Sequence, residues 1–562
     1  MRGLSTSTPS GAESLACDCS RRHAMARTQL SADERLLDAC ISGDEAAARA
    51  ALAAGASVHC VAVRAGSDAL PDGSVAFREQ LQCPLHLAAE HNQLGVAALL
   101  LASGADVNFL ACGVVRDGEG DAEQQCDTPL MCAAYYAHVP MLELLLSRGA
   151  DVAATTPKGE CALQFAACSP RVAEAPAAVA LLLAHGAPTE QASSCSGTPL
   201  TIAAAWGRAE VVRLLLAAGA DPCALSAGCD ATPLIAAARA PAADPVRARS
   251  AEVVRALLSA QPRVESFEVN ATNAAGETAL LAAARVGSGE QLAVVQALLD
   301  AGADARYADG EGATALHAAA ELGNATLLRT LLQAGAEVHA CNEAGETALH
   351  FAACSGCADA LTALLQAGAE AGAKRNDGTT PLMLAASSGD AEAAGALLAA
   401  GAPVDDADCD GRSALIVACE CSAADVAALL LSRGASPRAR LGAAPAGGCA
   451  GWTALHYAAA RGDVALVEVL AGGGACVAAL TDRRSSPLDL AVGGGHAAAA
   501  ALLRRLGGAS GAPAEAETYA PRPALSLSGR DNGTRPDTAD DAAAEPSAHE
   551  PAAAAAKCYT LQ

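Results

Sequence analysis

One nine-residue phrase returns along most of this chain and constrains its fold more than any other feature. Clear copies begin at Gly312, Gly345, Gly378 and Gly451, and each reads Gly, any residue, Thr, Ala or Pro, Leu, and ends in an Ala-Ala pair. About twenty residues after the start of each phrase come two leucines or a similar apolar pair, and then Gly-Ala or a close variant. Self-similarity at a fixed spacing is typical of stacked repeats rather than of independent domains.

The leucine of this phrase marks the units along the chain. Thirteen such leucines occur, at Leu36, Leu85, Leu130, Leu163, Leu200, Leu234, Leu280, Leu316, Leu349, Leu382, Leu415, Leu455 and Leu488. The four leucines from Leu316 to Leu415 are each 33 residues apart, and the longer gaps elsewhere indicate loop insertions. The sequence therefore predicts about thirteen repeats.

The residues of one unit predict two helices and a loop. Thr-Ala or Thr-Pro can begin a helix, because Thr caps free amides and Pro fits the first turn. Leu316, Ala319 and Ala320 have helical spacing, and a second helix is predicted over Thr326 to Gln333. Gly335 is expected to end that helix in a left-handed conformation, and Ala336 to Gly345 is expected to form a hairpin-like finger. One unit cannot bury its apolar face alone, so neighbouring units must stack.

Composition supports many thin cores and excludes several functional classes. Hydrophobic residues make up 52% of the 562 residues but aromatic residues only 2%, so alanine and leucine dominate the apolar content. The 62 acidic and 37 basic residues give a net charge of -25, which argues against a broad nucleic-acid-binding surface. No apolar run reaches the roughly 18 residues that a membrane-spanning helix needs. The 22 cysteines, in a long chain that shows no apolar signal segment, are expected to be reduced and mostly buried.

These phrases make the chain similar to the ankyrin-repeat family, from about Asp33 to Leu506. The resemblance implies an all-α solenoid of stacked helix-turn-helix repeats with β-hairpin-like fingers. It also implies that the histidines of the phrase, His86, His317, His350 and His456, tie their own loops to the next repeat. The unit at Leu234 departs from the pattern, because it lacks the Gly-Ala-Asp end and carries an insertion from Pro241 to Arg249. A weak seam is therefore expected near residues 240–273.

The two ends differ from the repeats in composition. Residues 1–32 are interpreted as a disordered leader, with a transit peptide as the alternative, and residues 33–508 as the solenoid. Residues 509–562, rich in Ala, Pro and acidic side chains, are interpreted as a disordered tail. We expect a monomer in the cytoplasm, with the nucleus as the alternative compartment. Two fingers are enlarged, over Val61 to Gln82 and Phe109 to Gln125, and are interpreted as either functional or disordered.

No motif predicts catalysis, a cofactor or a metal site. Asp406 to Gly411 resembles the start of a calcium loop, but the twelfth position is Val417 instead of a bidentate glutamate. Cys354 and Cys357 have a spacing used by metal and redox sites, but the sequence supplies no second ligand pair nearby. The phrases of P-loops, zinc proteases and serine hydrolases are missing from the sequence. We therefore expect a protein that is not an enzyme.

Large side chains at two outward-facing positions are the candidate binding residues. The two residues after each Ala-Ala pair are expected to project from the inner face of the stack, and the residue after the finger glycine to lie at the tip. Aromatic and arginine side chains there are typical interface anchors. The resulting candidates are Glu90, His91, Phe109, Tyr135, Tyr136, Trp206, Arg285, Trp452 and Arg461.

The sequence thus predicts a protein-interaction scaffold or adaptor with a protein partner of unknown identity. The first footprint to test runs from about Val61 to Trp206. The alternative is a substrate-recognition subunit of a larger complex such as a ubiquitin ligase. A redox or metal protein that uses Cys354 and Cys357 is the least favoured hypothesis.

Overall fold

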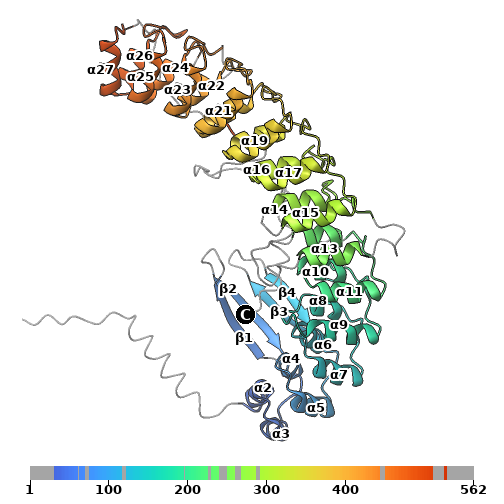
Figure 1. The fold of residues 1–562 in the computed structure, drawn as a ribbon. Coiled ribbons are helices and arrows are strands. Elements are labelled where there is room, and N and C mark those ends of the chain that lie inside the picture. The colour runs from blue at the N-terminus through green and yellow to red at the C-terminus, as the bar shows by residue number, and fades with distance from the viewer. Residues whose placement is uncertain are drawn as a thin grey trace, which may run out of the picture. The chain divides into compact units, whose positions relative to one another are not determined.

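A computed structural model shows the repeats as pairs of antiparallel helices joined by loops (Figure 1). It describes residues 31–60, 62–69, 75–116, 122–194, 197–225, 230–239, 250–259, 268–286, 291–442, 450–510 and 525–527. For residues 62–69, 75–82, 112–116 and 122–125 only the backbone is described. The described residues contain thirteen helix pairs, one for each predicted anchor leucine.

The first helix of each pair carries the anchor leucine. These first helices are α2 (Ala32–Ser42), α4 (Pro84–Glu90), α6 (Pro129–Tyr135), α8 (Ala162–Ala167), α10 (Pro199–Ala205), α12 (Pro233–Arg239), α14 (Ala279–Val286), α16 (Ala315–Glu321), α18 (Ala348–Ser355), α20 (Pro381–Ser388), α22 (Ala414–Glu420), α24 (Ala454–Arg461) and α26 (Pro487–Gly493).

The second helices run back beside them. They are α3 (Glu45–Ala53), α5 (Leu94–Ala102), α7 (Val139–Ser147), α9 (Ala175–Ala184), α11 (Ala209–Ala217), α13 (Ser250–Leu258), α15 (Gln291–Asp300), α17 (Ala325–Gln333), α19 (Ala358–Gln366), α21 (Ala391–Ala399), α23 (Ala424–Ser432), α25 (Val464–Gly472) and α27 (Ala497–Arg505).

The chain divides into two compact units, and the division falls inside α12. Unit 1 consists mainly of residues 1–236 and 245–267, and unit 2 mainly of residues 237–244 and 268–548. The seam predicted at residues 240–273 lies next to this division, and residues 240–249 and 260–267 of it fall outside the described residues. Within unit 2, first helices stack on first helices, as α16 does on α18 and α18 on α20. Second helices stack in the same way, as α17 does on α19.

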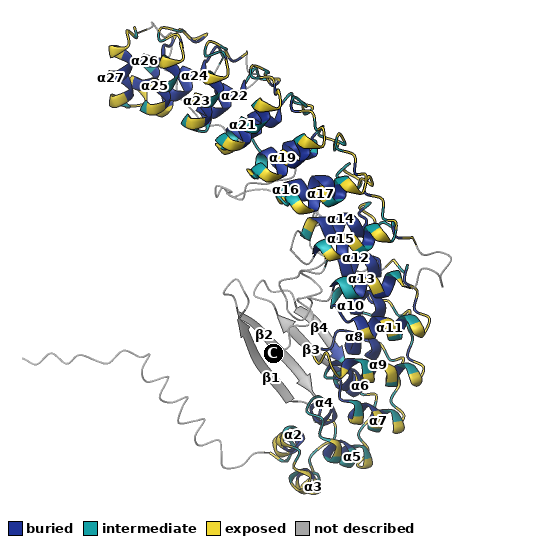
Figure 2. Ribbon diagram, in the orientation of Figure 1, coloured by how far each residue is buried: buried dark blue, intermediate teal, exposed yellow. Residues whose placement is uncertain are grey.

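The repeat at Leu316 shows how the sequence produces this stack. Leu316, Ala319 and Ala320 are buried along one face of α16, and Leu328 and Leu331 are buried on α17 (Figure 2). Gly335 ends the second helix with a φ of 89°, as the sequence predicts. The finger that follows closes through hydrogen bonds between the backbones of Asn342 and Glu346 and of Gly345 and Asn342. The burial of small and branched side chains on both helices holds adjacent repeats together.

The two enlarged fingers of unit 1 form a four-stranded antiparallel sheet. Its strands, in sheet order, are β1 (Ala62–Ala69), β2 (Val75–Gln82), β3 (Ala111–Arg116) and β4 (Ala122–Asp127). β1 and β2 form one hairpin, β3 and β4 the other, and β2 joins β3 through the register Phe77 to Arg116 and Glu79 to Val114. The backbones of two fingers from successive repeats are therefore hydrogen-bonded to each other. The sequence predicted two long fingers but not that they pair.

The cysteines depart from the sequence-based expectation at one position. Fourteen cysteines among the described residues are free. Burial raises the pKa of several of these thiols, that of Cys40 to about 12 and that of Cys83 to about 11. Cys126, in contrast, is disulfide-bonded. The expectation that the thiols are reduced was therefore wrong for Cys126. The pairing of β3 with β4, which the repeat pattern does not reveal, places the backbone of Cys126 opposite that of Cys112.

Two further expectations concern membranes and metals. Among the helices of the described ranges, none combines the length and the apolar character that crossing a bilayer requires. The described side chains contain no group of three or more histidine, cysteine or acidic residues arranged to hold a metal ion. In the segment that resembles a calcium loop, the carboxylate of Asp408 instead accepts the backbone N–H groups of Asp410 and Arg412 and pairs with the Arg412 side chain.

Candidate partner-binding face

The motif histidines link each repeat to the finger of the next. The Nε2 atom of His317 lies 3.1 Å from the carbonyl oxygen of Glu346, and that of His350 lies 3.3 Å from the carbonyl oxygen of Thr379. His86 makes the equivalent contact with the carbonyl oxygen of Asp127 at 2.9 Å. Nε2 of His456 lies 3.2 Å from the carbonyl oxygen of Ala479, which is earlier in the next finger. This is the linkage that the family resemblance implies.

At His317, His350 and His456, the hydrogen bonds around the ring fix which nitrogen carries the proton. The backbone N–H of Thr347 donates to Nδ1 of His350 over 3.1 Å, so Nδ1 must be an acceptor. The neutral ring therefore carries its proton on Nε2, which donates to the next finger. Burial lowers the pKa of His350 and of His456 to about 4, because desolvation disfavours the imidazolium form. These rings are therefore neutral at pH 7 and are structural.

We call the surface formed by the first helices and the fingers the inner face, and the two residues that follow the Ala-Ala pair of each first helix the slot. In the first repeats, the slot residues Glu90 and Tyr136 meet across neighbouring repeats of unit 1. The phenol of Tyr136 donates to the Glu90 carboxylate over 3.2 Å. Burial, reinforced by Glu90, raises the pKa of Tyr136, so the phenol remains a donor at neutral pH. Nε2 of His138 lies 2.9 Å from the Glu90 carbonyl oxygen, and its ring stacks on that of Tyr136 at 5.9 Å.

The other aromatic candidates of unit 1 differ in exposure. Tyr135 is buried, with 6% of its surface exposed, and meets Tyr136 edge-on at 5.1 Å. Tyr136 and Trp206 are half-buried at the ends of α6 and α10. The expectation that both slot residues project was therefore wrong for Tyr135. Tyr136 and Trp206 remain as ordered aromatic side chains that water and a partner can reach.

Phe109 and His91 are the remaining candidates of the first repeats. Phe109 is half-buried, stacks on His59 at 5.6 Å, and meets the motif residue His86 edge-on at 6.3 Å. It therefore supports the base of the second enlarged finger. His91 caps the end of α4 and is half-buried beside Glu90.

The expectation that Trp452 projects from a finger tip was wrong. Its side chain is fully buried, with 0% of its surface exposed. The indole lies against Tyr457 at 4.9 Å and His456 at 6.1 Å between ring centroids. The physical reason is that these two aromatic side chains of α24 offer the indole an apolar surface inside its own repeat. Trp452 is therefore part of the core of unit 2.

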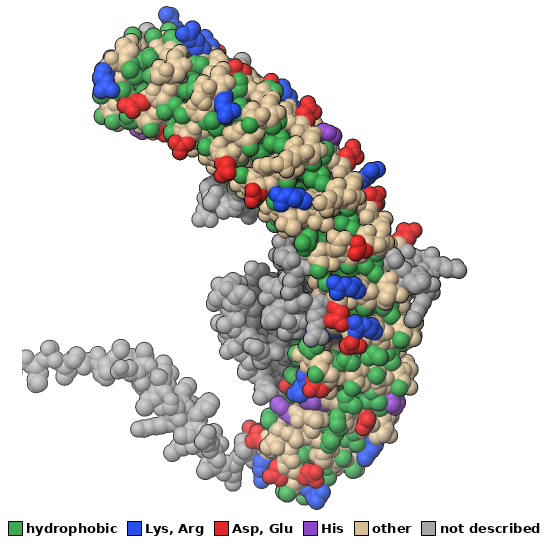
Figure 3. Space-filling view, viewed as in Figure 1, with side chains coloured by type: hydrophobic (Ala, Val, Ile, Leu, Met, Phe, Trp, Pro, Cys, Tyr) green, Lys and Arg blue, Asp and Glu red, His purple; other side chains and the backbone are tan. Residues whose placement is uncertain are grey.

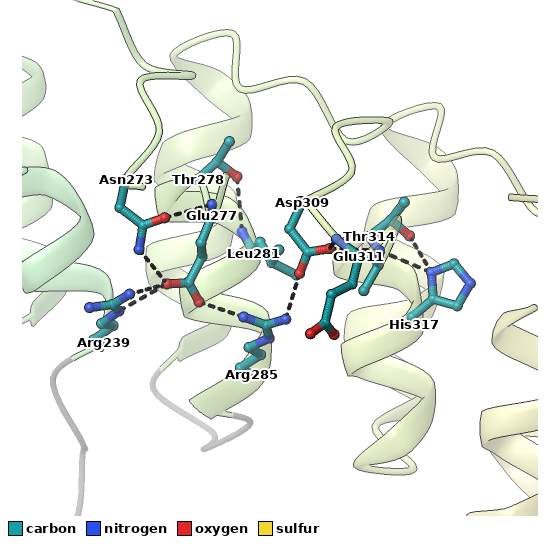
Figure 4. Close-up of polar contacts among 11 residues, drawn as sticks. Arg239, Asn273, Glu277, Thr278, Leu281, Arg285, Asp309, Glu311, Thr314 and His317 are labelled. Atoms are coloured by element: carbon teal, nitrogen blue, oxygen red, sulfur yellow. Dashed lines mark hydrogen bonds and ion pairs between the residues drawn. The ribbon is translucent and has the colours of Figure 1, made fainter. Parts of the chain in front are cut away.

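Arg285 is bound to carboxylates of its own chain, in a row of charges along the inner face of unit 2 (Figure 4). Its Nη1 lies 3.0 Å from Glu277, and its Nη2 lies 2.7 Å from Asp309. The Glu277 carboxylate also accepts a hydrogen bond from the guanidinium of Arg239. The backbone N–H of Glu277 donates to Oδ1 of Asn273 over 2.8 Å, which fixes the position of Glu277. These pairs satisfy Arg285, so it is not retained as an anchor for a partner.

The last arginine and the cysteine pair also contact their neighbours. Nε of Arg461, an exposed slot residue on α24, donates to Oγ of Ser422 over 2.9 Å. The thiol of Cys357 donates to the carbonyl oxygen of Gly323 over 3.0 Å, which ties its repeat to the preceding one. The Cys354 and Cys357 pair thus has a structural contact, and no metal-ligand group forms around it among the described residues.

Three contacts between repeats or distant segments were missed by reasoning from the sequence. Gln164 occupies the histidine position of the repeat at Leu163 and donates to the carbonyl oxygen of Gly197. The buried Arg208 donates to the carbonyl oxygen of Ser169 over 2.6 Å. Ser387, at the end of α20, contacts Leu525 from far along the chain. Only Gln164 had a usable signal, since its position follows the anchor leucine directly.

Charges on the visible surface are mixed. On the face shown in Figure 3, basic and acidic side chains of the described residues are interspersed, and no broad basic patch is seen there. A face of this kind fits a protein partner better than a phosphate backbone, which requires clustered positive charge.

The comparisons agree with the repeat architecture. Models of ankyrin repeats, each spanning three copies, match residues 24–156, 130–226, 242–342, 288–375 and 349–440, and a single-repeat model matches residues 450–482. No curated protein matches the chain. The matched residues cover most of the chain and coincide with helix pairs that stack through the motif contacts described above. The chain therefore belongs to the ankyrin-repeat family, whose repeats generally mediate protein–protein interactions.

Proposed function

We propose that this chain is a non-enzymatic scaffold or adaptor that binds a protein partner through the inner face of unit 1. The observation that carries the proposal is the pair of half-buried aromatic slot residues, Tyr136 and Trp206, at the ends of α6 and α10. Aromatic side chains in this state are the usual anchors of protein interfaces, since they supply a large contact area from few rotatable bonds.

The surroundings of Tyr136 support this role. The Glu90 carboxylate accepts a hydrogen bond from the phenol of Tyr136, and the His138 ring stacks on the Tyr136 ring. Glu90 and His138 belong to neighbouring repeats. The side chain is thus ordered before a partner arrives, and binding costs less conformational entropy than it would for a mobile side chain. Trp206 adds a second aromatic position in the same unit.

The sheet of β1 to β4 gives the partner a second contact region in the same unit. Its strands extend from the fingers of the first repeats, and β4 ends directly before α6. The finger loops of ankyrin-type repeats and the inner face next to them can therefore be engaged together. This arrangement supports a footprint within residues 61–206, as the sequence predicts.

The test is affinity capture from cells of the source organism with matched variants of the full chain. The interface variant carries Tyr136→Ala and Trp206→Ala, and leaves the buried Tyr135 intact. The control variant carries Tyr307→Ala, which removes an exposed tyrosine from unit 2. Circular dichroism and thermal melting establish that both variants fold like the wild-type protein.

The proposal predicts that the interface variant loses a defined protein that the wild-type protein and the Tyr307 control both retain. The purified partner should then bind the wild-type chain directly, and the interface variant at least about ten-fold more weakly. Equal capture by the interface variant and the control would refute the unit 1 footprint.

A further inference from the structure

Three residues from far along the chain lie against the repeats of unit 2. These residues, Leu525, Ser526 and Leu527, are separated from the last helix, α27, by residues 511–524. The N–H of Leu525 donates to Oγ of Ser387 over 3.0 Å, and Ser387 Oγ lies 3.5 Å from the Leu525 carbonyl oxygen. Nη1 of Arg375 donates to the carbonyl oxygen of Ser526 over 2.9 Å. We call Leu525–Leu527 the docked segment.

The contact combines main-chain recognition with one buried apolar side chain. The three hydrogen bonds described above involve backbone N–H and carbonyl groups of the docked segment. Leu527 has only 3% of its surface exposed, whereas Leu525 and Ser526 are half-buried. A buried leucine contributes apolar burial, and the backbone bonds fix its position along the repeats.

The docked segment occupies the same kind of position as the candidate anchors of unit 1. Ser387 follows the Ala385-Ala386 pair at the end of α20, so it is the slot residue of its repeat. Arg375 belongs to the finger that precedes α20. The segment thus lies where a first helix and its finger meet, which is on the inner face of unit 2.

The guanidinium of Arg375 is held in place by its own repeats. It lies 3.3 Å from the fully buried carboxylate of Glu346 and 3.4 Å from that of Asp377. These ion pairs orient Arg375 toward the docked segment without any contribution from it. The site therefore presents a fixed donor to a peptide carbonyl, with a hydroxyl on Ser387 that can both donate and accept.

The connecting chain is long enough for the segment to reach this site within one molecule. From α26 to α20 the stack takes three steps, through α24 and α22, or about 30 Å at the usual helix spacing. The chain from Ser510 to Leu525 can span about 50 Å when extended. A tethered ligand of this reach has an effective concentration in the millimolar range, so weak contacts suffice to keep it bound.

We propose that the docked segment is an internal ligand, and that the inner face at Arg375 and Ser387 is a binding site for a peptide with this Leu-Ser-Leu pattern. The site is closed in the intact chain and becomes available when the docked segment leaves. This second site is independent of the unit 1 footprint proposed above, because it involves different residues of a different unit.

The test uses the full chain and a fluorescent peptide that comprises residues 519–533. Binding is followed by fluorescence anisotropy for the wild-type chain and for Leu527→Asp, which places a charge at the buried position of the internal ligand. The peptide should bind Leu527→Asp at least about ten-fold more tightly than the wild-type chain, because the tethered competitor has been released. Equal affinity for both chains, or no binding to either, would overturn the proposal.

Two further variants separate the site from general effects on folding. Ser387→Ala in the Leu527→Asp background should weaken peptide binding about five-fold, since the bonds to the first leucine are lost. Ser388→Ala is the matched control, because Oγ of Ser388 donates to its own helix at Ala385. It should leave the affinity unchanged. Equal effects of both serine substitutions would contradict the assigned site.

Hydrogen exchange on the otherwise unaltered chain gives a second and independent readout. The amide of Leu525 should be protected in the wild-type chain, and its exchange should be about ten-fold faster in Ser387→Ala but not in Ser388→Ala. Light scattering over a range of concentrations distinguishes an internal ligand from exchange between two copies. Self-association that Leu527→Asp abolishes would show that the docked segment binds a second molecule, and would overturn the proposal that it binds its own chain.

Discussion

Nε2 of Gln164 donates to the carbonyl oxygen of Gly197 over 2.6 Å, which is the bond that the motif histidine makes to the next finger in other repeats. Oε1 of Gln164 accepts the backbone N–H of Cys161 over 2.7 Å, as Nδ1 of His350 accepts that of Thr347. A glutamine therefore replaces both functions of the histidine with a group that does not titrate. The position requires an acceptor and a donor at a fixed separation rather than an imidazole.

This equivalence predicts the effect of His350→Gln on the pH dependence of stability. Because the folded chain lowers the pKa of His350 to about 4, the unfolded chain takes up a proton first as the pH falls from about 6.5. The neutral His350 ring contributes fully to the stability of the fold above pH 6.5, and this contribution is lost as the pH falls from about 6.5 to about 4. As the pH falls through this interval, the free energy of unfolding of His350→Gln should therefore decrease by roughly 2 to 3 kcal/mol less than that of the wild-type protein.

Urea unfolding followed by circular dichroism, at about pH 7.5 and pH 4.5, measures this difference directly. Arg375, Glu346 and Asp377 face His350 and are common to both chains, so their own titration largely cancels in the comparison. His339→Gln, which alters an exposed histidine outside the motif, is the control and should follow the wild-type profile. Identical pH profiles for His350→Gln and His339→Gln would contradict the assignment of a neutral, hydrogen-bonded ring.

Much of the repeat architecture could be predicted from the sequence because its determinants are local. The anchor leucines, the capping residues or Pro at helix starts and the glycines at helix ends act within a few residues, and the first helix of each of the thirteen pairs carries its anchor leucine. The contacts of the motif histidines could be predicted for a related reason. A repeated position meets the same neighbour in every copy, so one resemblance covers His317, His350 and His456.

The features that were missed depend on contacts between distant or unrepeated residues. The pairing of β2 with β3 joins two insertions from different repeats, and no periodic signal encodes their register. The direction of Trp452 depends on Tyr457, a residue that other copies of the phrase replace with a different side chain. The docked segment is recognised through its backbone, which leaves little trace in the residue types of residues 525–527.

Truncation of an anchor leucine should destabilise unit 2. Leu382 has 1% of its surface exposed, so Leu382→Ala removes buried methyl groups and leaves a cavity between α20 and its neighbours. The expected loss in free energy of unfolding is about 2 to 5 kcal/mol, measured by urea denaturation. Leu322→Ala is the control, because Leu322 is 48% exposed and should change stability by less than about 0.5 kcal/mol. Wild-type stability of Leu382→Ala would contradict the stack.

The buried carboxylate of Glu277 should matter more than an exposed one. Glu277 has 6% of its side chain exposed and pairs with Arg239 and Arg285, so Glu277→Gln removes the counter-charge that Arg239 pairs with and leaves Arg285 with Asp309 alone. We expect a loss of about 1 to 3 kcal/mol in unfolding free energy. Glu210→Gln is the matched control, since its pair with Arg213 is solvent-exposed and should contribute less than about 1 kcal/mol. A larger effect at Glu210 would refute this ranking.

Peptide mapping without reductant tests the disulfide of the finger sheet. Cys126 is disulfide-bonded, and the register pairs its Cα with that of Cys112. Directly opposed residues of antiparallel strands are about 4.5 to 5.5 Å apart at Cα, which is a span that a disulfide can bridge. We expect a linked pair of peptides containing these two positions, and Cys132→Ser, which alters a free cysteine, should preserve it. Recovery of Cys126 as a free thiol from oxidised protein would contradict the link.

The two tryptophans should report opposite environments in fluorescence. Trp206→Phe leaves only Trp452, whose full burial predicts blue-shifted emission and little quenching by acrylamide. Trp452→Phe leaves only the half-buried Trp206, whose emission should lie at longer wavelength and be quenched more strongly. Trp452→Ala should also cost about 3 to 5 kcal/mol in unfolding free energy, because its indole fills space against Tyr457. Strong quenching of Trp452 would place it at the surface and restore it as a candidate anchor.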